Sequence, residues 1–350
     1  TLGGNIAATS GLDFSGNVTL AADIGLDDVG SAGVTFASSV DGNFRLSVKS
    51  GGLTEFLGDV GKSDPLASLA TDAGGTTEFS GGSVTTSGDQ TYGDAVNLAA
   101  DTTINATAGN VTFSSTVDGG YNLTVQTPNL TTFDGAVGVG TRLTSLTTDA
   151  GGTTKIAGGA INTTGGQTYG DAVNLAADTT INATAGNVTF SSTVDGGYNL
   201  TVQTPNLTTF DGAVGVGTRL TSLTTDAGGT TKIAGGAINT TGGQTYGDAV
   251  NLAADTTIDA TAGNVTFGST LDSVANAPRR TLELQAGGAI RFSGAVGNSS
   301  EIASLTLARA DSVSADSTLA IDGTGRELDG LRIGADVGNV TLNQPGSTIN

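Results

Sequence analysis

The chain contains no cysteine, methionine, tryptophan or histidine, and only 5 of its 350 residues are proline. Without Cys and His it lacks thiol nucleophiles, disulfides, imidazole bases and the side chains that most often bind transition metals. No apolar run approaches the about 18 residues that a membrane-spanning helix needs. The sequence therefore predicts a fold that is stabilised by packing, with no cofactor, no metal and no membrane insertion.

Charged residues are also scarce, at 13%, and they are unbalanced, with 33 acidic against 13 basic residues and a net charge of −20. A charge of that sign repels nucleic acids and anionic lipids, so we expect no nucleic-acid partner. Glycine is abundant instead, with 56 residues, and Thr, Asn, Ser, Ala and Val dominate between the glycines. Frequent glycine with little proline indicates regularly placed turns.

An internal repeat of 77 residues is the strongest signal in the chain. The block that begins Gln-Thr-Tyr-Gly-Asp-Ala-Val at Gln90 recurs at Gln167 and Gln244, and residues 90–166 and 167–243 are identical. The third copy has Asp259 where the second has Asn182. The remaining segments are interpreted as a divergent repeat (13–89), a partial repeat with a loop insertion near 273–280 (244–310), and degenerate coils (311–350).

Each repeat divides further into four sequence segments of 18 to 20 residues, which in one copy begin at Ile161, Ile181, Leu200 and Leu220. Apolar and polar residues alternate with a period of two, which is typical of strands and not of helices. Such short strands bury their apolar side only when successive coils stack. We predict an all-β fold, a right-handed parallel β-helix (β-solenoid) with coils of about 19 residues, four coils per repeat, continuous over 1–350. A string of small globular domains is the alternative.

Aromatic residues recur at equivalent positions of the coils. An inward stack of Phe is favoured, and an exposed aromatic strip is the alternative. The residues concerned are Phe36, Phe56, Phe113, Phe133, Phe190, Phe210 and Phe267. Five tyrosines lie beside glycine at expected turns, where corner packing is favoured over an exposed binding position: Tyr92, Tyr121, Tyr169, Tyr198 and Tyr246.

Acidic residues are spread over several expected corners, and we interpret them as surface groups that aid solubility. They are Asp94, Asp101, Asp118, Asp134 and Asp149, with copies at Asp171, Asp178, Asp195, Asp211 and Asp226. Some β-solenoids are polysaccharide lyases or hydrolases that use clustered Asp, but here the same arrangement recurs unchanged in two blocks. Calcium binding at these turns stays a weaker alternative, since the Gly-Gly-x-Gly-x-Asp motif is absent. We predict no enzyme and no catalytic residues.

Asn-x-Thr triplets begin at Asn105, Asn110, Asn122 and Asn129 and at their copies. They are candidate glycan acceptors, although a sequence rich in Asn and Thr contains such triplets by chance. The insertion at Ser273–Arg280 is expected to be a protruding loop, either solvated or in contact with a partner. Because the chain starts at Thr1 without Met, we expect a processed chain or a piece of a longer protein.

The 18 to 20 residue coil, the Gly-Asn-Val-Thr-Phe strand starts and the Gln-Thr-Tyr-Gly-Asp-Ala-Val block resemble the β-strand repeats of large filamentous-haemagglutinin-type bacterial adhesins, over about residues 13–310. The resemblance implies export by a two-partner or autotransporter route and an extracellular or cell-surface location. It implies a non-enzymatic adhesin shaft that holds a tip or partner-binding region away from the cell, with any host or surface ligand bound elsewhere. The alternative is a structural subunit of an extracellular filament or sheath, with end-to-end or lateral self-association.

Overall fold

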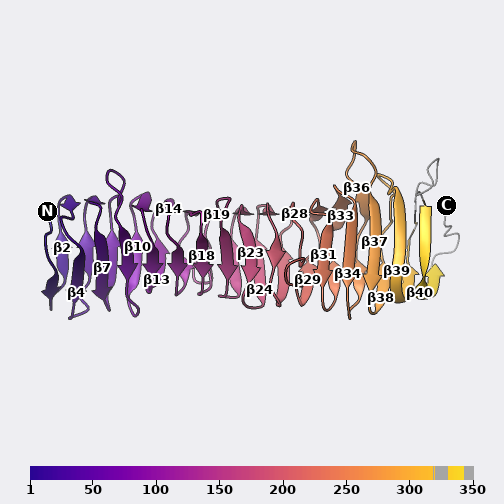
Figure 1. The fold of residues 1–350 in the computed structure, drawn as a ribbon, viewed down its shortest axis with the longest axis horizontal. Coiled ribbons are helices and arrows are strands. Elements are labelled where there is room, and N and C mark those ends of the chain that lie inside the picture. The colour runs from indigo at the N-terminus through magenta and orange to yellow at the C-terminus, as the bar shows by residue number, and fades with distance from the viewer. Residues whose placement is uncertain (318, 320–329, 343–350) are drawn as a thin grey trace. The chain divides into compact units, whose positions relative to one another are not determined.

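The structure, a computed structural model, describes residues 1–317, 319 and 330–342. These residues form strands, turns and loops, and none of them is in a helix, so no helix among them could cross a membrane. The chain divides into two compact units, Thr1–Ala177 and Asp178–Asn350. In both, short strands pair in parallel with strands about one turn away, which is the pattern of a β-solenoid (Figure 1). The predicted fold class is confirmed.

The first unit consists of three parallel sheets, named A, B and C here. Sheet A contains, in order, β1 (Ile6–Ala8), β4 (Ile24–Asp28), β7 (Arg45–Ser50), β9 (Ser68–Thr71), β12 (Gln90–Tyr92), β15 (Val111–Phe113), β18 (Leu130–Phe133), β20 (Thr153–Ile156) and β23 (Ala172–Leu175). Sheet B contains β2 (Leu12–Phe14), β5 (Val34–Phe36), β8 (Leu53–Phe56), β10 (Thr76–Phe79), β13 (Ala95–Leu98) and β16 (Val117–Asp118), and single bridges through Val137 lead on to β21 (Ala160–Thr163). Sheet C contains β3 (Val18–Thr19), β6 (Val40–Asp41), a bridge at Val60, then β11 (Ser83–Thr86), β14 (Thr102–Ala106), β17 (Asn122–Gln126), β19 (Ser145–Thr148) and β22 (Gln167–Tyr169).

The second unit has the same construction, with sheets named D, E and F. Sheet D contains β24 (Thr179–Ala183), β27 (Asn199–Gln203), β29 (Ser222–Thr225), β32 (Gln244–Tyr246), β35 (Val265–Phe267) and β38 (Ala289–Phe292). Sheet E contains β25 (Val188–Phe190), β28 (Leu207–Phe210), β30 (Thr230–Ile233), β33 (Ala249–Leu252) and β36 (Leu271–Ser273). Sheet F contains β26 (Val194–Asp195), a bridge at Val214, β31 (Ala237–Thr240), β34 (Thr256–Ala260) and β37 (Thr281–Ala286).

The long strand β39 (Ser304–Ala315) pairs with both β37 and β38, and β40 (Gly330–Leu342) pairs along β39. Residues 274–280 connect β36 to β37 without a strand of their own, and Figure 1 shows this connection extending beyond the neighbouring corners. Phe267 pairs with Phe292, 25 residues on, which matches the five extra residues in this turn. Residues 318, 320–329 and 343–350, part of the segment interpreted as degenerate coils, lie outside the described residues.

The coil is longer than the sequence segments predict. One turn takes about 21 residues, in place of about 19, and the solenoid has about 15 turns. In sheet A, Gln90 is in register with Val111, and the register continues through Thr131 and Thr154 to Val173. Those four turns span the 83 residues from Gln90 to Val173, more than one 77-residue repeat. The prediction of four coils per repeat is therefore wrong.

The reason is the number of strand positions in one repeat. Residues 90–166 contain ten strands, β12 to β21, and one further position formed by the isolated bridges at Val137 and Leu143, which both pair with β21. The repeat therefore has eleven strand positions distributed over three sheets. Eleven is not a multiple of three, and each copy therefore begins on a different sheet from the copy before it. Gln90 lies in sheet A and its copy Gln167 in sheet C.

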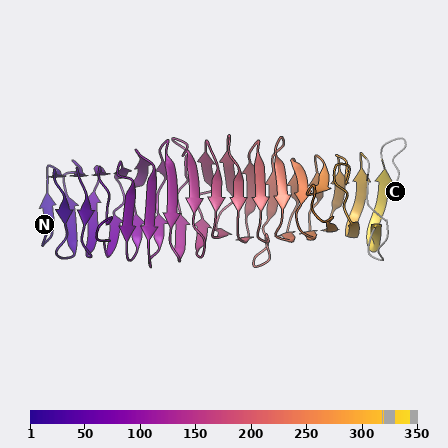
Figure 2. The ribbon, with the colours of Figure 1, turned by 90° about the horizontal axis from the view of Figure 1, so that it is seen from above.

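The interior is filled by inward-facing apolar side chains from all three sheets, because alternate residues of each strand face inward. The seven predicted Phe residues are all fully buried, which confirms the inward stack. Neighbouring rings stack in parallel, with centroids 5.1 Å apart for Phe113 and Phe133. In the first unit the ring ladder moves from sheet B to sheet A, where Phe79 and Tyr92 meet edge to face at 83°. Figure 2 shows the strands of each unit in the perpendicular view.

Candidate functional site

The tyrosines fall into two groups that the sequence did not separate. Tyr121 and Tyr198 lie at corners and are 40% exposed, whereas Tyr92, Tyr169 and Tyr246 end strands and are fully buried. Burial raises the pKa of the Tyr92 hydroxyl well above its usual value. The expectation of packing over exposure is confirmed for the three tyrosines of the Gln-Thr-Tyr motif. Their expected position at a corner is wrong, because period-two alternation turns them into the core together with Gln.

A buried hydrogen-bond network surrounds each of these Gln-Thr-Tyr motifs. The Tyr92 hydroxyl donates to Oε1 of Gln90 at 2.5 Å, and Gln90 Nε2 donates to Thr86 Oγ1 at 3.1 Å and to the carbonyl of Asn105 at 2.9 Å. The same Tyr-to-Gln bond measures 2.7 Å at Tyr246. Because Gln90 bonds to its own turn and to the next one, the network ties two turns together in one register.

Asp94 and its copies form the second buried polar feature, and here the interpretation as surface groups is wrong. Asp94, Asp171 and Asp248 are each 1% exposed. Asp94 follows Gly93 in a two-residue corner between β12 and β13. Its carboxylate contacts the corner at Gly75 in the preceding turn. Oδ1 accepts from the backbone N–H of Gly75 at 2.8 Å, and Oδ2 accepts from Thr77 Oγ1 at 3.0 Å.

Glycine is required on both sides of this contact. A Cβ on Gly75 would lie 2.4 Å from the carbonyl oxygen of Gly52, and one on Gly93 would lie 2.4 Å from that of Asp72. The corners therefore approach each other closely enough to enclose the Asp94 side chain. Burial is the main reason that the pKa of Asp94 is raised, and the nearby Asp72 carboxylate adds to the effect. The sequence held no signal for this burial, since it depends on stacking residues about 19 positions apart.

The other acidic residues of the corners behave largely as predicted. Asp101 and Asp178 accept bonds from the backbone N–H groups of Asn122 and Asn199, and those bonds lower the pKa of each carboxyl. Asp118 accepts from Gly140 and Thr141 and Asp195 makes the equivalent pair of bonds, while Asp149 and Asp226 accept from Thr127 and Thr204. Asp134 and Asp211 are exposed and pair with Lys155 and Lys232. Each of these eight carboxylates thus has its own backbone or lysine partner, and the structure does not assemble all of them into one acidic group.

Accessibility differs among the Asn-x-Thr triplets. Asn110 and Asn129 are exposed, whereas Asn105 and Asn122 are half-buried. The Asn129 Nδ2 group donates to the carbonyl of Ala108 at 2.9 Å, and the Thr131 that completes its triplet is fully buried. Of these four, Asn110 alone combines an exposed Asn with a half-buried threonine and has no bond from its Nδ2 group within the described residues.

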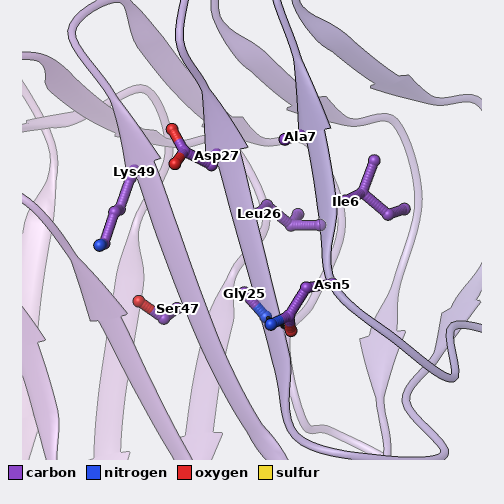
Figure 3. Close-up of a pocket in the computed structure, with 8 residues that line it drawn as sticks. All are labelled: Asn5, Ile6, Ala7, Gly25, Leu26, Asp27, Ser47 and Lys49. Carbon is purple, nitrogen blue, oxygen red and sulfur yellow. Dashed lines mark hydrogen bonds between the residues drawn. The ribbon is translucent and has the colours of Figure 1, made fainter.

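One shallow hollow lies on the outer side of sheet A, at β1, β4 and β7 (Figure 3). It has a volume of about 290 Å³ and is lined by Asn5, Ile6, Ala7, Gly25, Leu26, Asp27, Ser47 and Lys49. Gly25 is in register with Ser47, and its backbone N–H donates to Asn5 Oδ1 at 2.7 Å. Asp27 and Lys49 are in register on neighbouring strands, as an ordinary pair of surface charges would be. Within the described ranges no three Asp or Glu residues are placed to hold a metal ion.

Comparisons with known proteins add no relative: no family model, no curated protein and no solved structure matches this chain.

Proposed function

We propose that this chain is a non-enzymatic segment of the shaft of a secreted bacterial adhesin, located outside the cell and holding a tip or partner-binding region away from the cell surface. The observation that carries the proposal is the displacement of the repeat around the sheets. In the first unit the copies Gln90 and Gln167 lie in sheets A and C. In the second unit the copies β25 and β35 lie in sheets E and D.

Identical outward side chains consequently face different sides within each unit. A ligand-binding strip, or a lateral contact repeated along a filament, would need the same residues on one side at every repeat. The 77-residue block does not supply that, but it does supply turns. Its eleven strand positions make three and two-thirds turns, about 18 Å of stack at the spacing of parallel strands. Duplicating the block therefore lengthens the stack without repeating one binding surface on the same side, as a shaft requires.

The distribution of carboxylates supports a role without catalysis. Glycoside chemistry on β-solenoids requires two carboxyl groups to flank one bond. Here the exposed corner carboxylates are engaged by backbone N–H groups or by lysine, as at Asp101, Asp118 and Asp134, and the buried Asp94 is enclosed. Each therefore has a structural partner that explains its position.

The test is to delete residues 90–166 from the full parent protein in its own host. We expect the variant to reach the cell surface, shown by protease digestion of intact cells, to retain attachment, and to be shorter by about 18 Å in electron micrographs. Loss of attachment by a protein still displayed at the surface would make the block a binding element. Ordered multi-chain filaments would favour the alternative, a self-associating fibre subunit. A protein that stays inside intact cells would overturn the proposal.

A further inference from the structure

Three copies of one buried corner hold two carboxylates each and no cation. Asp94, Asp171 and Asp248 are the buried members, and they face Asp72, Asp149 and Asp226 respectively. Among the described residues none of these six forms an ion pair with Lys or Arg. The charged side chain that acts on each buried carboxylate is therefore another carboxylate.

The two hydrogen-bond donors at each buried aspartate differ in kind. One is a backbone N–H, from Gly152 to Asp171 Oδ1 at 2.8 Å, which can only donate. The other is a hydroxyl, Thr154 Oγ1 to Asp171 Oδ2 at 3.1 Å, which can equally accept. At Asp248 the distances are 2.8 Å from Gly229 and 3.0 Å from Thr231.

This arrangement suits a neutral carboxylic acid without any movement of the chain. Oδ1 would remain the acceptor of the glycine N–H, while a proton on Oδ2 would be donated to the threonine hydroxyl, which reverses its own direction. An ionised carboxylate offers about four acceptor sites and receives two bonds here, so burial leaves its charge poorly compensated.

We propose that Asp94, Asp171 and Asp248 are proton-binding corners that make both units of the solenoid more stable in mildly acidic than in neutral solution. Burial and the second carboxylate raise the pKa of each in the folded chain, whereas the unfolded chain keeps the ordinary value of about 3.9. Between these two pKa values the folded state binds more protons than the unfolded state, so stability rises as the pH falls through the folded pKa. Below about pH 4 both states are protonated and this gain stops.

Asparagine is the test substitution, because its oxygen accepts from the glycine N–H and its Nδ2 group donates to the threonine hydroxyl, as the protonated acid would. In the parent chain we expect the urea midpoint of unfolding to rise between pH 7.5 and pH 5. In the triple variant Asp94→Asn, Asp171→Asn, Asp248→Asn we expect a midpoint at pH 7.5 that already exceeds the parent's and changes less with pH. The control Asp27→Asn, Asp134→Asn, Asp211→Asn removes the same number of negative charges from exposed positions and should keep the parent's pH dependence.

A triple variant with the parent's pH dependence, or with a lower midpoint at pH 7.5, would overturn the proposal. A second measurement needs no variant. Unfolding of the parent at a pH between the ordinary pKa of about 3.9 and the raised pKa of these carboxyls should release protons, which calorimetry in buffers of different ionisation enthalpy detects. Unfolding without proton release there would be equally decisive against it. Neither result bears on whether the chain is a shaft.

Discussion

Arg219 and Asp259 form an ion pair in the second unit, with Arg219 Nη2 2.7 Å from Asp259 Oδ2. Arg309 Nη2 lies 3.3 Å from the other oxygen of the same carboxylate. Asp259 is the first position at which the third copy departs from the second, which has Asn182. The substitution thus lies where two arginines from other turns meet. A carboxylate has two oxygens, one for each arginine, whereas the amide of Asn has only one.

Replacing Asp259 by Asn should lower the free energy of unfolding by about 1 kcal/mol, since all three side chains are partly exposed and such pairs are weak. Urea denaturation at low salt measures the loss, and the loss should shrink in about 1 M NaCl, where charges are screened beyond about 3 Å. Asp211→Asn, which breaks a single contact of 3.3 Å with Lys232, should cost less. Equal effects, or a loss at Asp259 that is independent of salt, would contradict the two-arginine explanation.

The Phe ladder gives the sharpest contrast between neighbours in sequence. Phe133→Ala should cost about 3 to 5 kcal/mol, because the ring is fully buried and the space it leaves lies against Phe113. Asp134→Ala should cost under about 0.5 kcal/mol, because this side chain is exposed. Chemical denaturation of both variants checks the pair. Similar losses at the two positions would mean that the inward and outward directions at the end of β18 are wrongly assigned.

Buried threonines differ in whether their hydroxyl has a partner. Thr131 and Thr208 are fully buried, and their hydroxyls have none within the described residues. Thr131→Val should therefore be neutral or stabilise the fold by up to about 1 kcal/mol, since it removes an unsatisfied polar group at nearly constant shape.

The matched control is Thr154→Val, whose hydroxyl donates to Asp171. This substitution should cost about 1 to 3 kcal/mol, since it takes a donor from a buried carboxylate. Thermal unfolding should show a loss of stability for Thr154→Val and none for Thr131→Val if the hydrogen bonds are as described, and a loss at Thr131 as large as that at Thr154 would refute them.

How far the sequence predicted this structure depends on the range of the interaction. The strands and the inward Phe positions follow from alternation within a few residues, as in Val188-Thr-Phe190. The coil length does not, because corners range from the two residues Gly93 and Asp94 to longer loops, and only strand pairing shows which strands belong to one turn. Counting turns from Ile181 to Leu200 fails for this reason, since Leu200 is in register with Thr179 and Ile181 with Val202. Burial of Asp94 escaped prediction likewise, because Gly75 and Thr77 belong to the preceding turn.

Deleting a whole repeat and deleting part of one test whether folding depends on strand register or on the number of residues removed. Removing residues 90–166 joins Asp89 to Gln167, and the text that follows is identical to the text removed. Gln167 would take the place of Gln90 beside Leu69, so the first turn after the junction would pair as the deleted turn did. Each later strand would move to the next sheet and keep its neighbours. We expect the shortened chain to fold with one cooperative transition, because stacked turns contact only their neighbours.

Removing the ten residues Ile104–Phe113 is the control deletion. It removes most of β14 and all of β15 but leaves β13 and β16. Sheets A and C each lose one strand, whereas sheet B loses none. The buried sides of the remaining strands then cannot all stay in register, and we expect unfolding or aggregation. Circular dichroism with urea titration distinguishes the outcomes. A harmless ten-residue deletion, or an unfolded 77-residue deletion, would show that turn-by-turn stacking does not determine this fold.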